Sequence, residues 1–465
     1  MEDDMRAQVA DFLDRHSLNP DGIGMDGLCD YFMREMEKGL SGQKSSLPMI
    51  PSYCSPNALP RAGETVIVID AGGTNLRTCL VEFDPSLKPV VHDFKRTRMP
   101  GFDREVSAKE FFEVFAGGIE RLVDKSDRIA FCFSYAAEIL PDHDGVPIGF
   151  SKEIKAPEVI GMRLGENLLA ELARRGHDVS KKKVIILNDT VTTLLAAQSH
   201  NTDGKYDGCI GFILGTGTNT AYIEQNCRIQ KLPEGHCMQG CQIINVESGC
   251  LDICLGDIDR EFLDGTVNPK SYNFEKMISG AYLGPLGRHV IAAAVKEGLF
   301  SEGFSSRFED MCPCQDSLVT KDLSCFLEHE DSPSEYPCDS SQCYDCGSTD
   351  DNVLVKCVAG NEDDADILCE LLTAFIARAA KLTAVNLASA VLMTNFGKDS
   401  DHPVLINADG TTFYKTAYLR SFTQEYLDAF LAQKGRHAVF TRIEDSPIIG
   451  CAIGGLTLPL GFCSH

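Results

Sequence analysis

The stretch Asp70-Ala71-Gly72-Gly73-Thr74-Asn75-Leu76-Arg77 decides the fold, and it directly follows the apolar run 65–69. A run rich in Val and Ile predicts a buried β-strand, which would carry the carboxylate of Asp70 to its end. The two glycines let backbone amides approach a phosphate group closely. Thr74, Asn75 and Arg77 add side-chain donors. A bare Gly-Gly pair would be typical of an ordinary hairpin turn, but the complete string favours a phosphate-binding turn.

A second glycine turn also lies between two predicted strands. The string Gly215-Thr216-Gly217-Thr218-Asn219 lies between predicted strands over 209–214 and 220–224, and it suits the far end of a polyphosphate. The other predicted elements are strands over 77–83, 129–134, 184–187 and 403–407, and helices over 109–124, 162–174, 190–199 and 364–390. This alternation indicates an α/β protein with mixed sheets. Two halves that each contain a glycine-turn hairpin suggest an internal duplication with a cleft between them.

Several carboxylates follow predicted strands or open predicted turns. Asp189 stands in Asn188-Asp189-Thr190 at the end of the strand 184–187, where it could accept a proton from a hydroxyl group. Taken alone, this string is more typical of a helix N-cap. Glu247 and Glu275 would each, alone, be read as solvated surface residues, and the string 408–411 (Ala-Asp-Gly-Thr) alone as a turn.

The charge balance excludes some classes of partner. The 465 residues contain 68 Asp and Glu against 43 Lys and Arg, a formal charge of −25. Such a surface repels phosphate backbones and anionic lipids, so we expect no nucleic-acid partner and no membrane partner. The acidic start lacks a signal-peptide pattern, and no apolar run approaches the length that spans a bilayer. Many of the 20 cysteines lie in apolar strand-like runs, among them Cys79, Cys132 and Cys209, which indicates free thiols in a reducing compartment.

One segment breaks the alternation. Residues 309–350 hold six cysteines among Asp, Ser and Pro, and we expect a mobile surface insertion there. The spacing of Cys312-x-Cys314 and Cys343-x-x-Cys346, with Cys338 nearby, could hold zinc. A flexible loop with incidental thiols is the favoured alternative, so no metal is expected in this segment.

Six strings, taken together and in order, resemble the hexokinase family in the form found in eukaryotic hexokinases and glucokinase: 70–77, 188–190, 215–219, 245–249 around Glu247, 274–284 around Glu275, and 408–411. The resemblance runs from about Glu64 to Gly450, apart from the cysteine-rich segment, and is most specific at 70–77 and 274–284. It implies a two-lobed actin-like (ribonuclease H-like) ATPase fold with duplicated α/β domains around a cleft. It also implies transfer of the γ-phosphoryl group of Mg-ATP to the 6-hydroxyl of a hexose. Glucose is the first candidate, with mannose and fructose after it.

The same resemblance implies a division of the chain and a setting for the reaction. Residues 1–62 would form an N-terminal helix and connector on the large lobe, 63–200 the small lobe, 201–444 the large lobe, and 445–465 a segment that returns to the small lobe. The reaction would be the first step of glycolysis, catalysed in the cytoplasm by a monomer or homodimer.

The resemblance also assigns site residues. Asp189 would be the general base, and Lys152 would offset charge on the transferred phosphoryl group. The implied sugar contacts are Ser134, Ser151, Lys152, Asn188, Asp189, Asn219, Glu247 and Glu275. The implied contacts to ATP are Asp70, Gly72, Gly73, Thr74, Asn75, Arg77, Gly215, Thr216, Gly217, Gly410 and Thr411. Mg²⁺ would arrive with ATP and have no direct protein ligand, with Asp70 acting on it through water.

The chain departs from the family pattern at several places. Residues 134–136 read Ser-Tyr-Ala where the family has Ser-Phe-Pro, and 150–153 read Phe-Ser-Lys-Glu for Trp-Thr-Lys-Gly. Further departures are Thr192 for Gly, Ser248 for Trp, Pro285 for Glu, and 444–450 for a Gly-Ser-Gly-Lys-Gly pattern. The departures at 134–136 and 446–449 favour the alternative of a catalytically weak, hexokinase-like sugar sensor. Retention of both Asp189 and Lys152 favours an enzyme.

Overall fold

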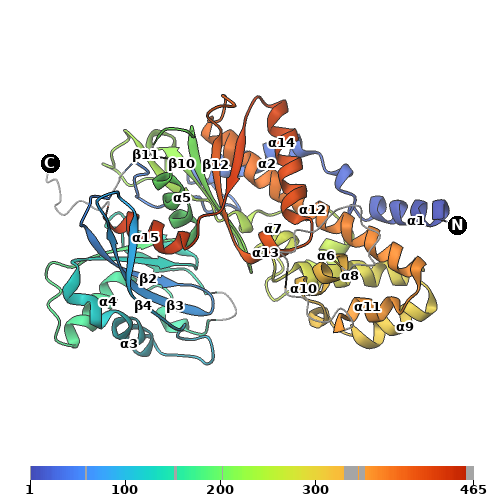
Figure 1. Cartoon of the computed structure of the whole chain (residues 1–465), viewed down its shortest axis with the longest axis horizontal. Coiled ribbons are helices and arrows are strands. Elements are labelled where there is room, and N and C mark those ends of the chain that lie inside the picture. The colour runs from blue at the N-terminus through green and yellow to red at the C-terminus, as the bar shows by residue number, and fades with distance from the viewer. Residues whose placement is uncertain are drawn as a thin grey trace.

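The computed structural model describes residues 2–57, 60–150, 154–201, 203–328, 344 and 351–456. It has two lobes, each built on a mixed β-sheet (Figure 1). The lobe with α3 and α4 lies at the lower left of Figure 1, and the lobe with the helices from α6 to α12 extends to the right.

The small lobe contains a five-stranded sheet in the order β4-β3-β2-β5-β8. Its strands are β2 (Thr65–Ala71), β3 (Asn75–Phe83), β4 (Pro89–Arg98), β5 (Arg128–Phe133) and β8 (Lys183–Leu187). β2 pairs antiparallel with β3 and parallel with β5, and β5 pairs parallel with β8. The carboxyl ends of β2, β5 and β8 therefore meet at one edge, which is where ligands bind in sheets of this kind.

The large lobe repeats this arrangement. Its sheet has the order β1-β11-β10-β9-β12-β13, with antiparallel pairs from β1 to β9 and parallel pairs from β9 to β13. The strands are β1 (Ile50–Pro51), β9 (Gly208–Leu214), β10 (Thr218–Gln225), β11 (Cys241–Asn245), β12 (Val404–Asp409) and β13 (Ala438–Thr441). The β9–β10 hairpin thus corresponds to β2–β3, and β12 to β5. The predicted duplicated α/β fold is confirmed.

Helices cover both faces of the small-lobe sheet and connect the lobes. α3 (Ala108–Ile119) and α4 (Leu164–Arg174) pack on one face, and α15 (Ser446–Leu456) on the other. α5 (Asp189–Ser199) packs against α15 and also against β9, β10 and β12 of the large lobe. One apolar cluster therefore contains residues of both sheets, such as Val66 and Cys209.

The long helix α12 (Glu362–Thr394) forms the centre of the large lobe, and the apolar face of its 33 residues is buried. The other helices around it are α6 (Asp257–Gly265), α7 (Asn273–Ile278), α8 (Leu283–Lys296), α9 (Glu302–Met311), α10 (Thr320–Leu327), α11 (Val353–Val358), α13 (Thr411–Lys415) and α14 (Leu419–Gln433). No helix in the described part of the chain is both long and apolar enough to cross a bilayer.

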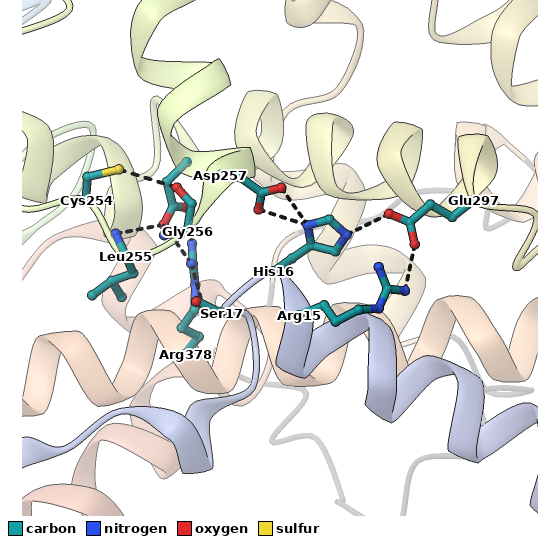
Figure 2. A network of polar contacts seen from close by, with 10 residues as sticks. Arg15, His16, Ser17, Cys254, Leu255, Gly256, Asp257, Glu297 and Arg378 are labelled. Atoms are coloured by element: carbon teal, nitrogen blue, oxygen red, sulfur yellow. Dashed lines mark hydrogen bonds and ion pairs between the residues drawn. The ribbon is translucent and has the colours of Figure 1, made fainter.

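The N-terminal segment forms two helices, α1 (Glu2–Arg15) and α2 (Met25–Leu40), which pack on α12. Figure 2 shows His16, at the end of α1, between two carboxylates of the large lobe. Its Nδ1 lies 2.8 Å from Asp257 Oδ1, and its Nε2 lies 2.7 Å from Glu297 Oε1. Arg378 of α12 donates to the carbonyl of Ser17 at 3.3 Å. These contacts fix α1 on the large lobe.

The expectation of a surface insertion over 309–350 is wrong for its first part. Residues 309–328 include the end of α9 and all of α10, and Cys312 and Leu323 are fully buried. Leu323 and Phe326 lie on the apolar face of α10 and pack in the core of the large lobe, which composition alone does not predict. Cys338, Cys343 and Cys346 lie outside the described residues, and among the described ones no group of three His, Cys, Asp or Glu is placed to hold a metal.

Candidate functional site

Three aspartates from both sheets come together at the site. Asp70 ends β2, Asp189 follows β8, and Asp409 ends β12. The pKa of Asp70 is raised to about 6, chiefly by burial and also by the negative charges of Asp189 and Asp409, against the opposing charge of Arg77 at 3.4 Å. Asp409 stands in one of the predicted strings but was not itself predicted as a site residue.

The residue that caps helix α5 is Asn188 and not Asp189. Asn188 is the N-cap of α5, because its Oδ1 accepts a hydrogen bond from Thr190 N at 2.9 Å. Asp189 is the first residue of the helix, and its carboxylate accepts hydrogen bonds from the hydroxyls of Ser134 and Thr190. Burial raises the pKa of Asp189 to about 6. The helix-cap alternative therefore applies to Asn188 and leaves the carboxylate of Asp189 available.

An amide network crosses from α5 to the large-lobe hairpin. Asn219 Nδ2 lies 3.4 Å from Asn188 Oδ1 and 2.7 Å from Asn245 Oδ1. Asn245 Nδ2 in turn donates to Glu247 Oε1 at 2.8 Å. Asn245 is buried and was not predicted as a site residue, although it stands only two positions before Glu247. The structure brings the predicted residues Asn188, Asn219 and Glu247 together.

Two glutamates flank this network. Glu247 has a left-handed backbone, with φ 56°, which is uncommon for a residue other than glycine. Glu275 Oε2 accepts a hydrogen bond from Thr218 N at 3.0 Å. The pKa of Glu247 is raised to about 7, chiefly by burial and in part by the negative charge of Asp189. The pKa of Glu275 is likewise raised to about 7, chiefly by burial and in part by the negative charge of Glu247.

The arrangement of these glutamates suits a neutral ligand. Neither Glu247 nor Glu275 forms an ion pair within the described residues. Carboxylates of this kind are strong acceptors for hydroxyl donors. A polyhydroxylated ligand would therefore find several acceptors here, together with the amide of Asn219.

The first glycine turn joins β2 to β3 and is tied to the neighbouring strand β4. Gly72 N donates to Asn75 O at 3.1 Å and closes the turn. The side chain of Asn75 donates to Thr74 Oγ1 at 2.6 Å and accepts from Arg96 Nε at 2.9 Å. Arg96 belongs to β4 and was not predicted at the site.

The second glycine turn is held by two neighbouring segments. Gly215 O accepts from Gly280 N and from Thr412 Oγ1, both at 2.8 Å. Gly410 has φ 115°, and a Cβ there would lie 2.3 Å from the carbonyl oxygen of Leu214. Only glycine allows this approach, which brings Gly410 and Thr411 beside the turn 215–217.

These features fit a nucleotide with its phosphates. A Cβ on Gly217 would lie 2.5 Å from Glu275 Oε2, so a side chain at this position would displace the Glu275 carboxylate. Asp70, at the end of β2, could act on a nucleotide-bound Mg²⁺ through water, because Mg²⁺ usually keeps several of its water ligands. Ser151 and Lys152 lie outside the described residues.

Comparisons with known proteins agree with this geometry. Two family models, both described as hexokinase, match residues 8–199 and 209–457. Glucokinase-1 of Kluyveromyces lactis is 28% identical over 92% of this chain and 94% of its own length. Hexokinase-1 of Mus musculus is 27% identical over 82% of this chain, and the match covers only 38% of the mouse protein.

Solved structures show the same fold. The hexokinase of Schistosoma mansoni, solved with glucose, superposes with a TM-score of 0.75 over 98% of this chain and 100% of the other, at 23% identity. A second structure, described as hexokinase, gives a TM-score of 0.74 at 22% identity, over 97% of this chain and 99% of the other.

Proposed function

Because the chain belongs to the hexokinase family, we propose that it transfers the γ-phosphoryl group of Mg-ATP to the 6-hydroxyl of a hexose. Glucose is the first candidate substrate, followed by mannose and fructose. The reaction would serve as the first step of glycolysis in the cytoplasm.

The observation that carries this proposal is the position of Asp189. Its carboxylate lies within electrostatic reach of Asp70 and Asp409 on the phosphate side and of Glu247 on the other. Its pKa of about 6 leaves it mostly ionised at pH 7, yet basic enough to take a proton as the hydroxyl attacks phosphorus. Ser134 donates a hydrogen bond to this carboxylate and orients it.

The other residues have roles that follow from their chemistry. Glu247, Glu275, Asn188 and Asn219 would hold the hydroxyl groups of the sugar. The glycine turns at 72–75 and 215–217, with Gly410 and Thr411, would hold the phosphates and the nucleoside. Asp70 would act on Mg²⁺ through water, and Lys152 remains the predicted cation at the transferred phosphoryl group. Mg²⁺ bound with ATP would neutralise phosphate charge.

A coupled ADP-release assay tests the proposal. It compares glucose, mannose, fructose, galactose and N-acetylglucosamine at saturating Mg-ATP, with the Asp189→Asn variant as the control. ADP release that depends on a hexose in the wild-type protein, and is lost in the variant, supports the proposal. Hexose binding by calorimetry without any ADP release would contradict it and favour a sugar sensor.

A further inference from the structure

Tyr135 lies next to Ser134 and contacts the first glycine turn. Its hydroxyl donates to Gly72 O at 3.0 Å and lies 3.4 Å from Gly73 O. The side chain is buried, and its ring packs against Phe133 and Phe150, with ring centroids at 5.1 and 5.3 Å. The hydroxyl therefore has a fixed position beneath the turn.

This contact sets the direction of the amides in the turn. In a trans peptide the carbonyl and the N–H of one unit point in opposite directions. With the carbonyls of Gly72 and Gly73 directed toward Tyr135, the N–H groups of Gly73 and Thr74 point away from it. Thr74 O is occupied separately, because it accepts from Met99 N at 3.1 Å. The turn is thus held with its donors displayed on one side, as an anion requires.

The same segment also reaches the proposed base. Ser134 N donates to Ala71 O at 3.2 Å, and the Ser134 hydroxyl donates to the carboxylate of Asp189. Two consecutive residues therefore connect the end of β2, the glycine turn and Asp189. We propose that the Tyr135 hydroxyl is a positioning group that couples the glycine turn to the Ser134–Asp189 pair, so that the phosphates and the base are aligned together.

This inference rests on the proposed function for its kinetic part. It concerns a feature of this chain, because residues 134–136 read Ser-Tyr-Ala where the family pattern reads Ser-Phe-Pro. Phenylalanine has no hydroxyl, and proline would stiffen the next position. In this chain the hydrogen bond of Tyr135 restrains the segment, because Ala136 lacks the stiffness that proline has at this position in the family pattern.

The test is Tyr135→Phe, which removes one oxygen and keeps the ring. We expect the KM for Mg-ATP to rise about three- to tenfold, as the loss of one intramolecular hydrogen bond implies. Hexose affinity by calorimetry and the thermal midpoint should change little. Tyr31→Phe is the matched control, because the Tyr31 hydroxyl also donates to a backbone carbonyl, that of Asp252 at 2.8 Å, but in the large lobe away from the turn. It should leave the KM for Mg-ATP unchanged.

Two further measurements do not depend on turnover. Hydrogen exchange of the amides at 72–75 should speed up in Tyr135→Phe, and binding of Mg-ADP by calorimetry should weaken by a similar factor to KM. The double variant Tyr135→Phe/Ala136→Pro should recover part of both losses.

Unchanged exchange and unchanged nucleotide binding in Tyr135→Phe would overturn the inference. Equal losses of hexose and nucleotide binding, with a lowered thermal midpoint, would also overturn it, because Tyr135 would then be only a packing residue. A wild-type protein without turnover would contradict the proposed function, while exchange and Mg-ADP binding would still decide the role of Tyr135.

Discussion

At the scale of single residues, Asp189 carries the most specific prediction. Asp189→Asn keeps the shape of the side chain and its contact with Ser134 but cannot accept a proton. We expect kcat to fall by at least about a hundredfold, the lower end for losing a general base, with near-normal hexose affinity by calorimetry. The exposed residue Asp127, in the same lobe, provides the control Asp127→Asn, which should keep its activity. Retention of most of the turnover in Asp189→Asn would contradict its role as the base.

Glu247 and Glu275 carry a prediction about the sugar. Gln at either position should chiefly weaken hexose use, because each substitution replaces a charge-assisted hydrogen bond of roughly 1.5–3 kcal/mol, or about ten- to a hundredfold in affinity. Steady-state kinetics should show a raised KM for hexose and a much smaller change in the KM for ATP. An equal fall in ATP affinity would contradict the assignment of these two glutamates to the sugar.

The raised pKa values of the same glutamates predict a pH dependence. Both have a pKa of about 7 without ligand, so each gains its negative charge as the pH rises from 6 to 8. The carboxylate is the better acceptor for a sugar hydroxyl, so hexose affinity should rise over this range and binding should release protons. Calorimetry in two buffers of different ionisation enthalpy measures that release, and Glu247→Gln should reduce it. Affinity that is flat from pH 6 to 8 would contradict the prediction.

At the scale of elements, the turn after β12 depends on one glycine. Gly410→Ala would place a methyl group 2.3 Å from Leu214 O in a backbone with φ 115°. The strain should cost roughly 1–3 kcal/mol of unfolding free energy and displace the turn at 215–217, so both the thermal midpoint and the affinity for Mg-ATP should fall. Gly435→Ala is the matched control, since Gly435 has φ 61° but a Cβ there would meet nothing within 4 Å. Equal effects of both variants on nucleotide affinity would show that the contact with Leu214 has no role in binding.

The elements also show what sequence patterns can and cannot predict. The two strand–turn–strand units were predictable, because apolar runs and paired glycines are local signals. The role of Asn245 was not, because it depends on the register of β11 against β10, where Asn245 lies opposite Ala221. The expectation of a surface insertion at residues 309–328 is wrong for a similar reason. Cys312 and Leu323 are buried by helices far away in the sequence, and the composition of the segment itself carries no signal of those contacts.

At the scale of the whole molecule, the site is shared between the lobes. Asp189 and Ser134 come from the small-lobe side, and Asn219, Glu247 and Glu275 from the large lobe. A bound hexose that contacts both sets should favour a closed form, which would also exclude water from the phosphoryl group. Small-angle scattering should show a smaller radius of gyration at saturating hexose. The Glu247→Gln variant, measured at the same hexose concentration, should show less compaction, and an unchanged radius in the wild-type protein would contradict closure.

The packing of α15 on the small-lobe sheet has a consequence for biosynthesis. One face of that sheet is completed only by residues 446–456, while β5 ends at residue 133. At the usual rates of translation, roughly 15–60 s separate the appearance of these two segments. During that time the apolar side chains that α15 will cover, such as Val66 and Ala130, have no permanent partner. Most of the small lobe is therefore synthesised early, but its fold is completed only when α15 emerges. A nascent chain arrested before α15 would expose this apolar face of the sheet, and we expect chaperones to bind it.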